Sequence, residues 1–295
     1  MAAEQKLRTI AITDHDTVDG VAEALNAGGE FGVRVIPGIE ISVEDHDAHI
    51  LGFGVDYKNS ELLAYSEEAK KNRIEGAQKM VENLKNAGFV VEWRDVLKEA
   101  VGGIVARPHI VKAVLGRTEN KRKLGGISTV YEFIEKFLGN DSPYYVKRQH
   151  ISAHDAINLI HQATGVAVWS HPAVHFRPPD NAPTNFESLE KFLEELRGRG
   201  LDGIEVFTPS HTEDDVEFIL GLVEEHKLLK TAGSDFHEKG QEKKAVPTEN
   251  GVVELRSAAS VGDYPTYGFS TEGIIEKLDE AIEKYRGGPG SLKKI

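Results

Sequence analysis

The sequence predicts an α/β protein in which a buried sheet or barrel carries the functional residues at one rim. Six short apolar runs, rich in Val and Ile and punctuated by Gly, have the length and composition of buried strands of a parallel sheet or barrel. Segments with helical spacing lie between several of these runs, and such alternation is typical of β/α folds. The runs are Thr9–Thr13, Val35–Ile39, His49–Phe53, Gly165–Trp169, Gly203–Phe207 and Leu228–Ala232.

A residue that can bind a metal stands beside each run. In chain order these residues are His15, Glu40, His49, His171, His211 and the pair Asp235 and His237. Because the carboxyl ends of parallel strands meet at one rim of a barrel, we expect several of these side chains to converge there. A ring of His, Asp and Glu at that rim is typical of a hydrolytic site with more than one metal ion.

The strand-like runs are interrupted by a long helical segment. Residues 9–60 alternate strand and helix patterns, with a first helix expected over Thr17–Leu25 and Asp16 or Thr17 as its N-cap. Between residues 61 and 149 helical patterns dominate, among them one from Pro108 to Leu115. The alternation resumes at Ser152. We therefore predict a barrel domain formed by residues 1–60 and 150–295, with a helical insertion at residues 61–149 that covers the active-site rim.

The composition limits which metal ions the protein can hold and which partners it can bind. The chain has 295 residues, 40% of them hydrophobic, no cysteine and a net charge of −13. Without cysteine any metal must be held by nitrogen and oxygen, which favours Mn, Zn, Fe or Mg. The acidic balance argues against long nucleic acid but permits a small phosphate ester, because bound cations reverse the local charge. No run of eighteen apolar residues and no signal-peptide pattern is present, so we expect a cytoplasmic protein that does not bind a membrane.

Three local patterns contribute most to the metal hypothesis. The spacing Asp235-x-His237 places two side chains on one face of an extended segment. Pro172 follows His171, stops the strand and fixes the direction of the imidazole. Glu40 lies in an otherwise apolar strand, where an unpaired carboxylate would be costly to bury and a metal ion would remove that cost. A single histidine at a strand end is more often structural, so the prediction depends on the joint pattern.

These motifs resemble the PHP family, the polymerase and histidinol phosphatase superfamily, and within it the TrpH-like phosphoesterases. The segments that carry the resemblance follow the family order: Ala11–Gly20 (AITDHDTVDG), Pro37–Ser42 (PGIEIS), His49–Phe53 (HILGF), Arg107–His109 (RPH), Ser170–Pro172 (SHP) and Gly233–His237 (GSDFH). The resemblance implies a distorted PHP-type β/α barrel. It also implies hydrolysis of phosphate esters by a hydroxide held by two or three divalent metal ions, with Mn, Zn or Fe as the candidates.

The resemblance also implies a set of metal ligands, with Glu40 bridging two ions: His15, Glu40, His49, His171, Asp235 and His237. In the family, a strand bearing His-x-His and a loop bearing an Asp ligand precede the part that matches Met1–Leu7. We therefore expect a barrel whose first strand and three of whose ligands are missing. The metal position formed by Glu40, His49 and His171 keeps its ligands best.

Two residues of the insertion are candidates for contact with the substrate. Arg107 and His109 lie at a predicted helix start, which offers backbone N–H groups to an anion. The resemblance makes them catalytic residues that contact the substrate phosphate, and a structural role is an equal alternative. Glu205 is expected to be buried behind the ligands, while His175 and His211 are loop residues expected along the cleft.

The predicted function is a metal-dependent hydrolase of phosphate esters, acting on a nucleotide or a short RNA. One alternative is a degenerate, non-catalytic PHP domain that retains metal for stability or partner binding. Another is a metal-dependent hydrolase of C–N bonds, which uses the same types of ligand; the anion site expected at Arg107 argues against it. The sequence leaves the exact substrate and the oligomeric state open.

Overall fold

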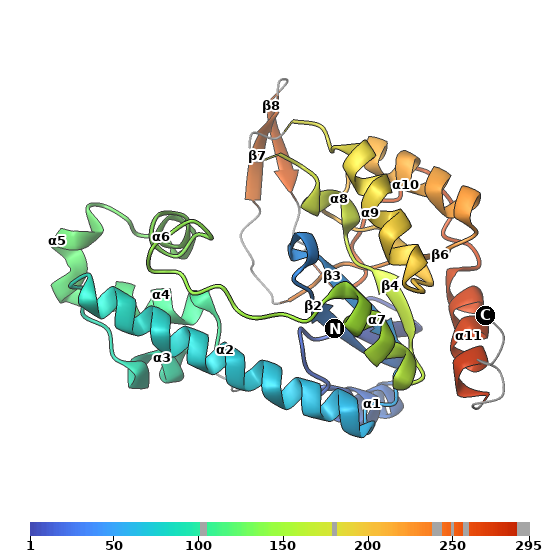
Figure 1. Ribbon diagram of the computed structural model, residues 1–295, viewed down its shortest axis with the longest axis horizontal. Coiled ribbons are helices and arrows are strands. Elements are labelled where there is room, and N and C mark those ends of the chain that lie inside the picture. The colour runs from blue at the N-terminus through green and yellow to red at the C-terminus, as the bar shows by residue number, and fades with distance from the viewer. Residues whose placement is uncertain (101–104, 179–181, 238–243, 249–250, 256–259, 288–295) are drawn as a thin grey trace. The chain divides into compact units, whose positions relative to one another are not determined.

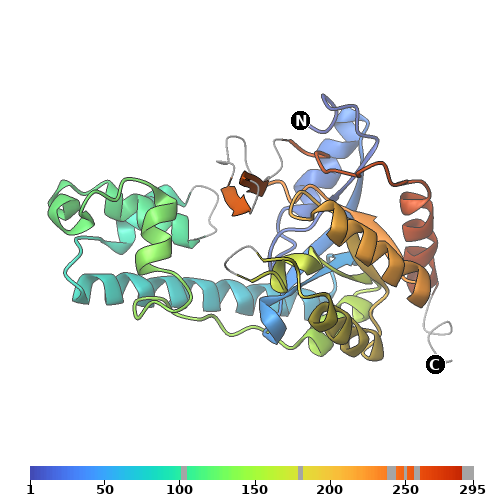
Figure 2. The ribbon, with the colours of Figure 1, turned by 90° about the horizontal axis from the view of Figure 1, so that it is seen from above.

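The computed structural model describes residues 1–100, 105–178, 182–237, 244–248, 251–255 and 260–287 (Figure 1). The chain folds as two compact units, one of residues 1–64 and 151–295 and the other of residues 65–150. The first is called the barrel unit and the second the helical unit. Their boundary falls within α2 (Ser60–Asn86), which is one continuous helix (Figure 2).

A curled sheet of six strands, in chain order from β1 to β6, forms the centre of the barrel unit. Its strands are β1 (Thr9–Ile12), β2 (Arg34–Ser42), β3 (His49–Phe53), β4 (Val166–Trp169), β5 (Gly203–Phe207) and β6 (Leu229–Ala232). The predicted α/β class is confirmed, and each strand coincides with one of the apolar runs. Two further strands, β7 (Lys244–Thr248) and β8 (Gly251–Leu255), form a separate antiparallel pair.

The sheet is mixed, which corrects the expectation of purely parallel strands. β3 pairs antiparallel with β2 and with β4, whereas β1 with β2, β4 with β5 and β5 with β6 are parallel. In the register of β2 and β3, Ser42 faces His49. Because β3 runs in the opposite direction, its first residue lies at the rim where the other strands end. This explains why His49 begins its apolar run while the other candidate ligands follow theirs.

Helices cover the outside of the curled sheet (Figure 1). The helices of the barrel unit are α1 (Val21–Phe31), α7 (Ala153–Gln162), α8 (Pro172–His175), α9 (Phe186–Gly198), α10 (Glu213–His226) and α11 (Ile274–Arg286), with the short 3-10 turn η1 (Asp45–Asp47). Leu278 and Ile282 of α11 pack against strand residues such as Val166 and Val168 in a shared apolar core. Burial of these side chains is the main force that holds α11 on the sheet.

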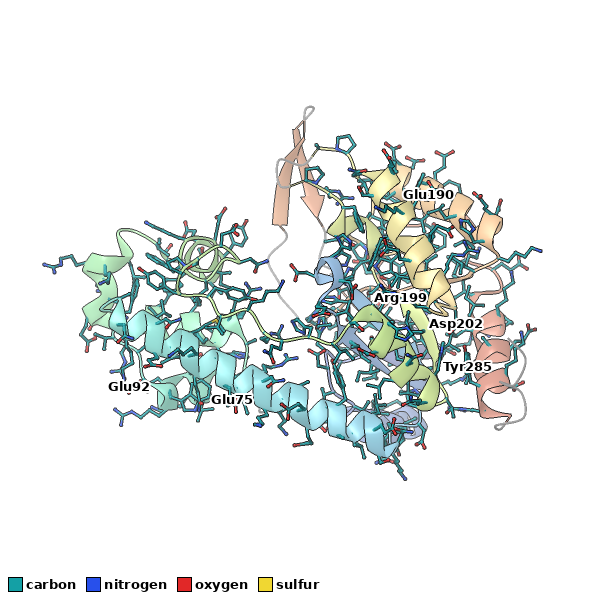
Figure 3. All side chains as sticks on the ribbon, in the orientation of Figure 1. Glu75, Glu92, Glu190, Arg199, Asp202 and Tyr285 are labelled. Atoms are coloured by element: carbon teal, nitrogen blue, oxygen red, sulfur yellow. The ribbon has the colours of Figure 1, made fainter. Side chains whose placement is uncertain are left out.

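A polar network ties α11 to the sheet at the start of β5. The Tyr285 hydroxyl donates to Asp202 at 2.8 Å, and both residues are labelled in Figure 3. The other oxygen of Asp202 accepts the backbone N–H of Ala167 at 2.8 Å and lies 2.9 Å from Nε2 of His161. The Tyr285 and His161 rings are stacked. Because Asp202 precedes β5, the network lies at the end of that strand opposite to the rim.

The first helix begins later than the sequence pattern predicts. α1 starts at Val21 with Gly20 as its N-cap and without a side-chain cap. Asp16 instead has a left-handed backbone and is 4% exposed. Its carboxylate accepts the Ser42 backbone N–H at 2.9 Å, so it joins the loop after β1 to the end of β2.

The helical unit has its own apolar core. Besides most of α2 it contains α3 (Trp93–Glu99), α4 (Arg107–Leu115), η2 (Thr118–Asn120), α5 (Lys121–Leu124) and α6 (Val130–Phe137). Its buried side chains include Leu84, Ile110 and Phe133. Asn120 is also buried, accepts the Val90 N–H at 2.7 Å and donates to the Val90 and Val114 carbonyls, each at 2.8 Å. Among the described residues, no helix combines the length and apolarity needed to cross a bilayer.

Candidate metal centre

Three donor atoms from three strand ends form a nearly equilateral triangle. Nδ1 of His49 lies 3.0 Å from Oε1 of Glu40 and 3.1 Å from Nε2 of His171. Nε2 of His171 lies 3.2 Å from the same Glu40 oxygen. Two ligand atoms held about 2.0–2.2 Å from one ion are about 3 to 3.5 Å apart in tetrahedral or octahedral geometry. The triangle therefore has the dimensions of three ligands on one face of a divalent cation.

The local folding of each strand end explains why these side chains meet. Glu40 lies near the end of β2, and the antiparallel register brings His49 to the same end of the sheet. His171 follows β4, and the N–H of the preceding Ser170 donates to the His49 carbonyl at 3.0 Å. His171 has a φ of 30°, a left-handed conformation that turns the chain sharply before Pro172 begins α8. The turn leaves the imidazole at the rim.

Glu40 is a buried carboxylate whose charge is compensated by histidines. It is 5% exposed. Burial by itself would raise the pKa of Glu40, but the nearby His15 and the bonds with His171 and His49 hold this pKa well below its usual range. The carboxylate is therefore ionised at neutral pH, which is the state that a metal ligand requires.

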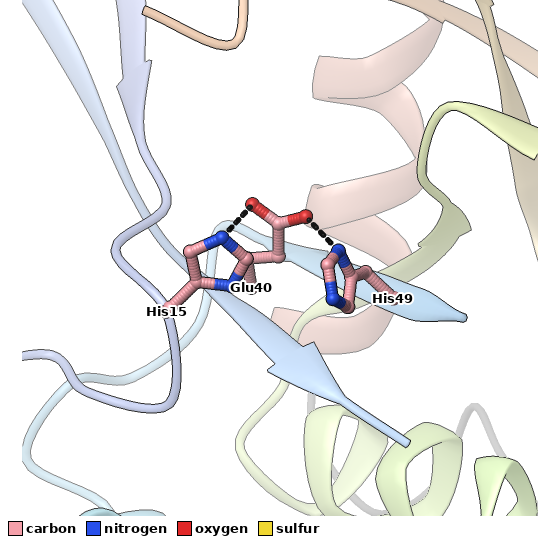
Figure 4. Close-up of side chains that lie close together, drawn as sticks. All are labelled: His15, Glu40 and His49. Atoms are coloured by element: carbon pink, nitrogen blue, oxygen red, sulfur yellow. Dashed lines mark ion pairs between the residues drawn. The ribbon is translucent and has the colours of Figure 1, made fainter. Parts of the chain in front are cut away.

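The second oxygen of Glu40 faces a different histidine. Oε2 lies 3.8 Å from Nε2 of His15, whereas Oε1 is directed at His49, as Figure 4 shows. His15 and Glu40 are adjacent through a parallel β-bridge, and the Glu40 N–H donates to the Asp14 carbonyl at 3.1 Å. One oxygen of Glu40 thus faces His49 and His171, and the other faces His15. A carboxylate in this arrangement is suited to bridge two cations.

Asp235 and His237 lie at the open side of this arrangement. Their side chains are 48% and 47% exposed, and Nδ1 of His237 lies 3.6 Å from Oδ1 of Asp235. The His237 ring centroid lies 5.9 Å from that of His15. The segment is not extended as the spacing argument assumed, because β6 ends at Ala232 and Asp235 has a φ of 47°. The structure thus gathers His15, Glu40, His49 and His171, and brings His237 next to His15.

His171 is held by groups behind the triangle. Its backbone N–H donates to Oε2 of Glu205 at 2.8 Å, and its ring Nδ1 lies 3.1 Å from Nε2 of His175. Burial lowers the pKa of His171, but its bond with Glu40 and the charges of Glu40 and Glu205 outweigh burial and raise this pKa to about 9. We therefore expect both ring nitrogens of His171 to be protonated at neutral pH in the metal-free protein, so that a cation that binds Nε2 must displace one proton.

Glu205 is buried in β5, and its carboxylate lies beside Gly233. A Cβ on Gly233 would lie 2.5 Å from Oε1 of Glu205. Burial raises the pKa of Glu205 to about 7. His211 is also buried, and its Nδ1 donates to the Val206 carbonyl at 2.8 Å. Burial lowers the pKa of His211 to about 4, so it is neutral and serves the backbone, although its position after a strand had suggested a place along the cleft.

Arg107 and His109 belong to the helical unit, at the start of α4. The Arg107 guanidinium donates to the Leu138 carbonyl at 3.1 Å and to Asn140 at 3.3 Å, and lies over the Tyr145 ring. Nδ1 of His109 accepts the backbone N–H of Ala106 at 3.0 Å. Both side chains therefore have defined partners within their own unit.

Some contacts of the site had only weak signals in the sequence. Asp16 stands before a helical pattern and was expected to cap it, and nothing in the spacing pointed to Ser42. The His175 contact has a local signal, because His175 lies four residues after His171, which is one helical turn. That signal becomes meaningful only when α8 is known to be helical.

Comparison with known proteins agrees with this geometry. Residues 1–142 match the PHP domain. The 3′,5′-nucleoside bisphosphate phosphatase of Chromobacterium violaceum is 29% identical over 81% of this chain and 80% of its own length. The 5′-3′ exoribonuclease Rnm of Salmonella typhimurium is 27% identical over 80% of this chain and 78% of its own.

A solved structure extends the comparison to nearly the whole chain. It is that of a protein from Bifidobacterium adolescentis proposed to be a metal-dependent phosphoesterase, with a TM-score of 0.74 and 25% identity. The match covers 95% of this chain and 88% of that one. The expected PHP-type fold is therefore confirmed, and residues 1–142 match the PHP domain.

Proposed function

We propose that this protein is a metal-dependent phosphoesterase that hydrolyses phosphate esters of nucleotides or short oligonucleotides. The observation that carries the proposal is the Glu40 carboxylate, with one oxygen in the triangle with His49 and His171 and the other toward His15. The names of the relatives, a bisphosphate phosphatase and an exoribonuclease, support phosphate esters as the substrate class.

We propose that the site binds two divalent cations. The first would be held by His49, His171 and Oε1 of Glu40, and the second by Oε2 of Glu40, His15 and the nearby His237. The donors are imidazole nitrogens and carboxylate oxygens, which suit Mn, Zn or Fe. When bound, such ions supply an activated water as nucleophile and neutralise the charge of the phosphoryl group.

Residues of the protein would orient the two cations and the substrate phosphate. The ionised Glu40 sets the negative charge around which the cations gather, and the support behind His171 holds that imidazole in one direction. We include Arg107 and His109 in the proposal as contacts for a phosphate group, because the start of α4 offers backbone N–H groups that favour anions.

The test is hydrolysis by the full chain after loading with Mn²⁺. Suitable substrates are adenosine 3′,5′-bisphosphate, a short 5′-phosphorylated RNA and p-nitrophenyl phosphate, with an amide panel as the comparison for C–N bonds. We expect phosphate or nucleotide release, its loss in His171→Ala, and its retention in the control His154→Ala on α7, whose histidine is exposed. Release from none of the esters by a protein with two bound ions would refute the proposal.

A second candidate is a PHP domain that holds one metal without catalysis. It is favoured by the exposure of Asp235 and His237, which lie at the surface, whereas the donor atoms of Glu40, His49 and His171 lie 3.0–3.2 Å apart. It predicts one Mn²⁺ per chain in elemental analysis and no ester hydrolysis. Two ions per chain with turnover would exclude it.

A further inference from the structure

His175 contacts the imidazole of His171 at the ring nitrogen that is not part of the triangle, and its ring centroid lies 5.8 Å from that of His49. Nε2 of His175 lies 3.1 Å from Nδ1 of His171, and the two ring centroids are 5.0 Å apart. Nε2 of His171 is at the same time 3.1 Å from His49 and 3.2 Å from Glu40. The two nitrogens of this imidazole therefore have different partners, Nδ1 with His175 and Nε2 with His49 and Glu40.

The backbone around α8 fixes the position of His175. α8 begins with Pro172 and contains four residues, so His175 lies one helical turn after His171. The Ala173 N–H donates to Nε2 of the buried His211 at 3.4 Å, which ties the start of α8 to the segment that follows β5. The next residue after α8, Phe176, is buried against the aromatic rings of Trp169 and Phe192.

The chemistry of imidazole assigns a donor and an acceptor to this contact. A histidine that binds a cation through Nε2 uses the lone pair of that nitrogen, so its proton resides on Nδ1. Nδ1 of His171 must then donate, and Nε2 of His175 must accept. Metal-binding histidines generally donate their second N–H to such an acceptor, which fixes ring orientation and raises the basicity of the ligand.

We propose that His175 is a positioning residue of the metal centre, which accepts the Nδ1–H of His171 and holds Nε2 of His171 toward Glu40 and His49. The inference rests on the metal site of the proposed function but not on hydrolysis. It assigns His175 the role that a carboxylate or a backbone carbonyl has in many other metal sites. Neutral His175 in this role carries its own proton on Nδ1.

The test measures Mn²⁺ affinity of the full chain by isothermal titration. We expect His175→Ala to weaken binding of the triangle ion by about 10- to 100-fold, the usual effect of removing such a partner. His175→Gln should retain most of the affinity, because its side-chain oxygen can accept the same hydrogen bond. The control His154→Ala should bind as the unmodified protein does, because the exposed His154 contacts Asn158 on its own helix.

A second measurement separates positioning from a purely structural role. ¹⁵N spectra of the Zn²⁺-loaded protein should show His171 protonated at Nδ1 and His175 protonated at Nδ1 with an unprotonated Nε2. Unchanged Mn²⁺ affinity in His175→Ala, equal losses in the Ala and Gln variants, or the opposite tautomer of His175 would each overturn the proposal. A protein that binds Mn²⁺ but hydrolyses no ester would refute the proposed function and leave this inference intact.

Discussion

Metal binding should compete with a proton on His171. The affinity for a metal ion should therefore depend on pH, and the pKa of His171 sets the size of this effect. Burial opposes the charged imidazole, but the bond with Glu40 and the charges of Glu40 and Glu205 outweigh burial and raise the pKa of His171 to about 9. At pH 7 about 99% of the metal-free protein therefore carries this proton. Each cation that enters the triangle should release about one proton from His171.

The expected dependence on pH follows from this competition. Between pH 6 and 8 the affinity for Mn²⁺ should rise about tenfold per pH unit, which corresponds to about 1.4 kcal/mol per unit. The stability of the metal-free protein should change with pH in the opposite direction, because it falls as pH rises. A histidine with a raised pKa stabilises the fold fully below its unfolded value of 6.5, and this contribution is lost as pH rises through about 9. The free energy of unfolding of the metal-free protein should therefore fall by up to about 3 kcal/mol over this range.

Two assays check the reasoning. Isothermal titration with Mn²⁺ at pH 6, 7 and 8, repeated in buffers of different ionisation enthalpy, counts the protons released. A ¹⁵N titration of the metal-free protein follows His171 directly. A His171 that titrates near 6.5, together with an affinity that does not change between pH 6 and 8, would show that the bond with Glu40 does not hold the proton.

Three further substitutions test separate parts of the fold. Gly233→Ala should displace the Glu205 carboxylate, because the new Cβ would lie 2.5 Å from Oε1. Mn²⁺ affinity measured by titration should then fall about tenfold or more. Unchanged affinity would show that Glu205 does not support the site. Asn120→Ala removes three hydrogen bonds of a buried side chain and should lower the free energy of unfolding of the helical unit by about 2–4 kcal/mol in urea. A loss under about 1 kcal/mol would be incompatible with these bonds. Tyr285→Phe removes the hydrogen bond to Asp202 and should lower the free energy of unfolding by about 1–2 kcal/mol in urea, with Mn²⁺ affinity unchanged. A loss of Mn²⁺ affinity would contradict the location of this network away from the rim.

Much of the centre could be anticipated because strand ends are local features. An apolar run followed by Glu40 or by His171 identifies both the strand and the residue that follows it, and strand ends of one sheet meet at one rim. The convergence of Glu40 and His171 needed only that rule. The roles of Asp235 and His237 remain predictions, because they depend on a segment whose backbone at Asp235 is left-handed and not extended.

Other features could not be read from spacing because they depend on long-range pairing. The reversed direction of β3 is set by its hydrogen bonds to β2 and β4, and only this direction places His49 at the rim. Asp16 had two available partners, the helix after it and the end of β2, and the tertiary fold selected Ser42. The position of Glu205 behind His171 likewise requires β4 and β5 to be neighbours.

The sequence by itself determined the strands, the helical segment between residues 61 and 149, the nitrogen and oxygen donors and the resemblance to the PHP domain. These properties follow from local composition, periodicity and motifs. The tertiary structure decided which oxygen of Glu40 faces which histidine, that His175 contacts His171, and that Glu40 and Glu205 raise the pKa of His171. The physical reason is that distances of about 3 Å and shifts in pKa arise from groups that are remote in the chain and meet only after burial.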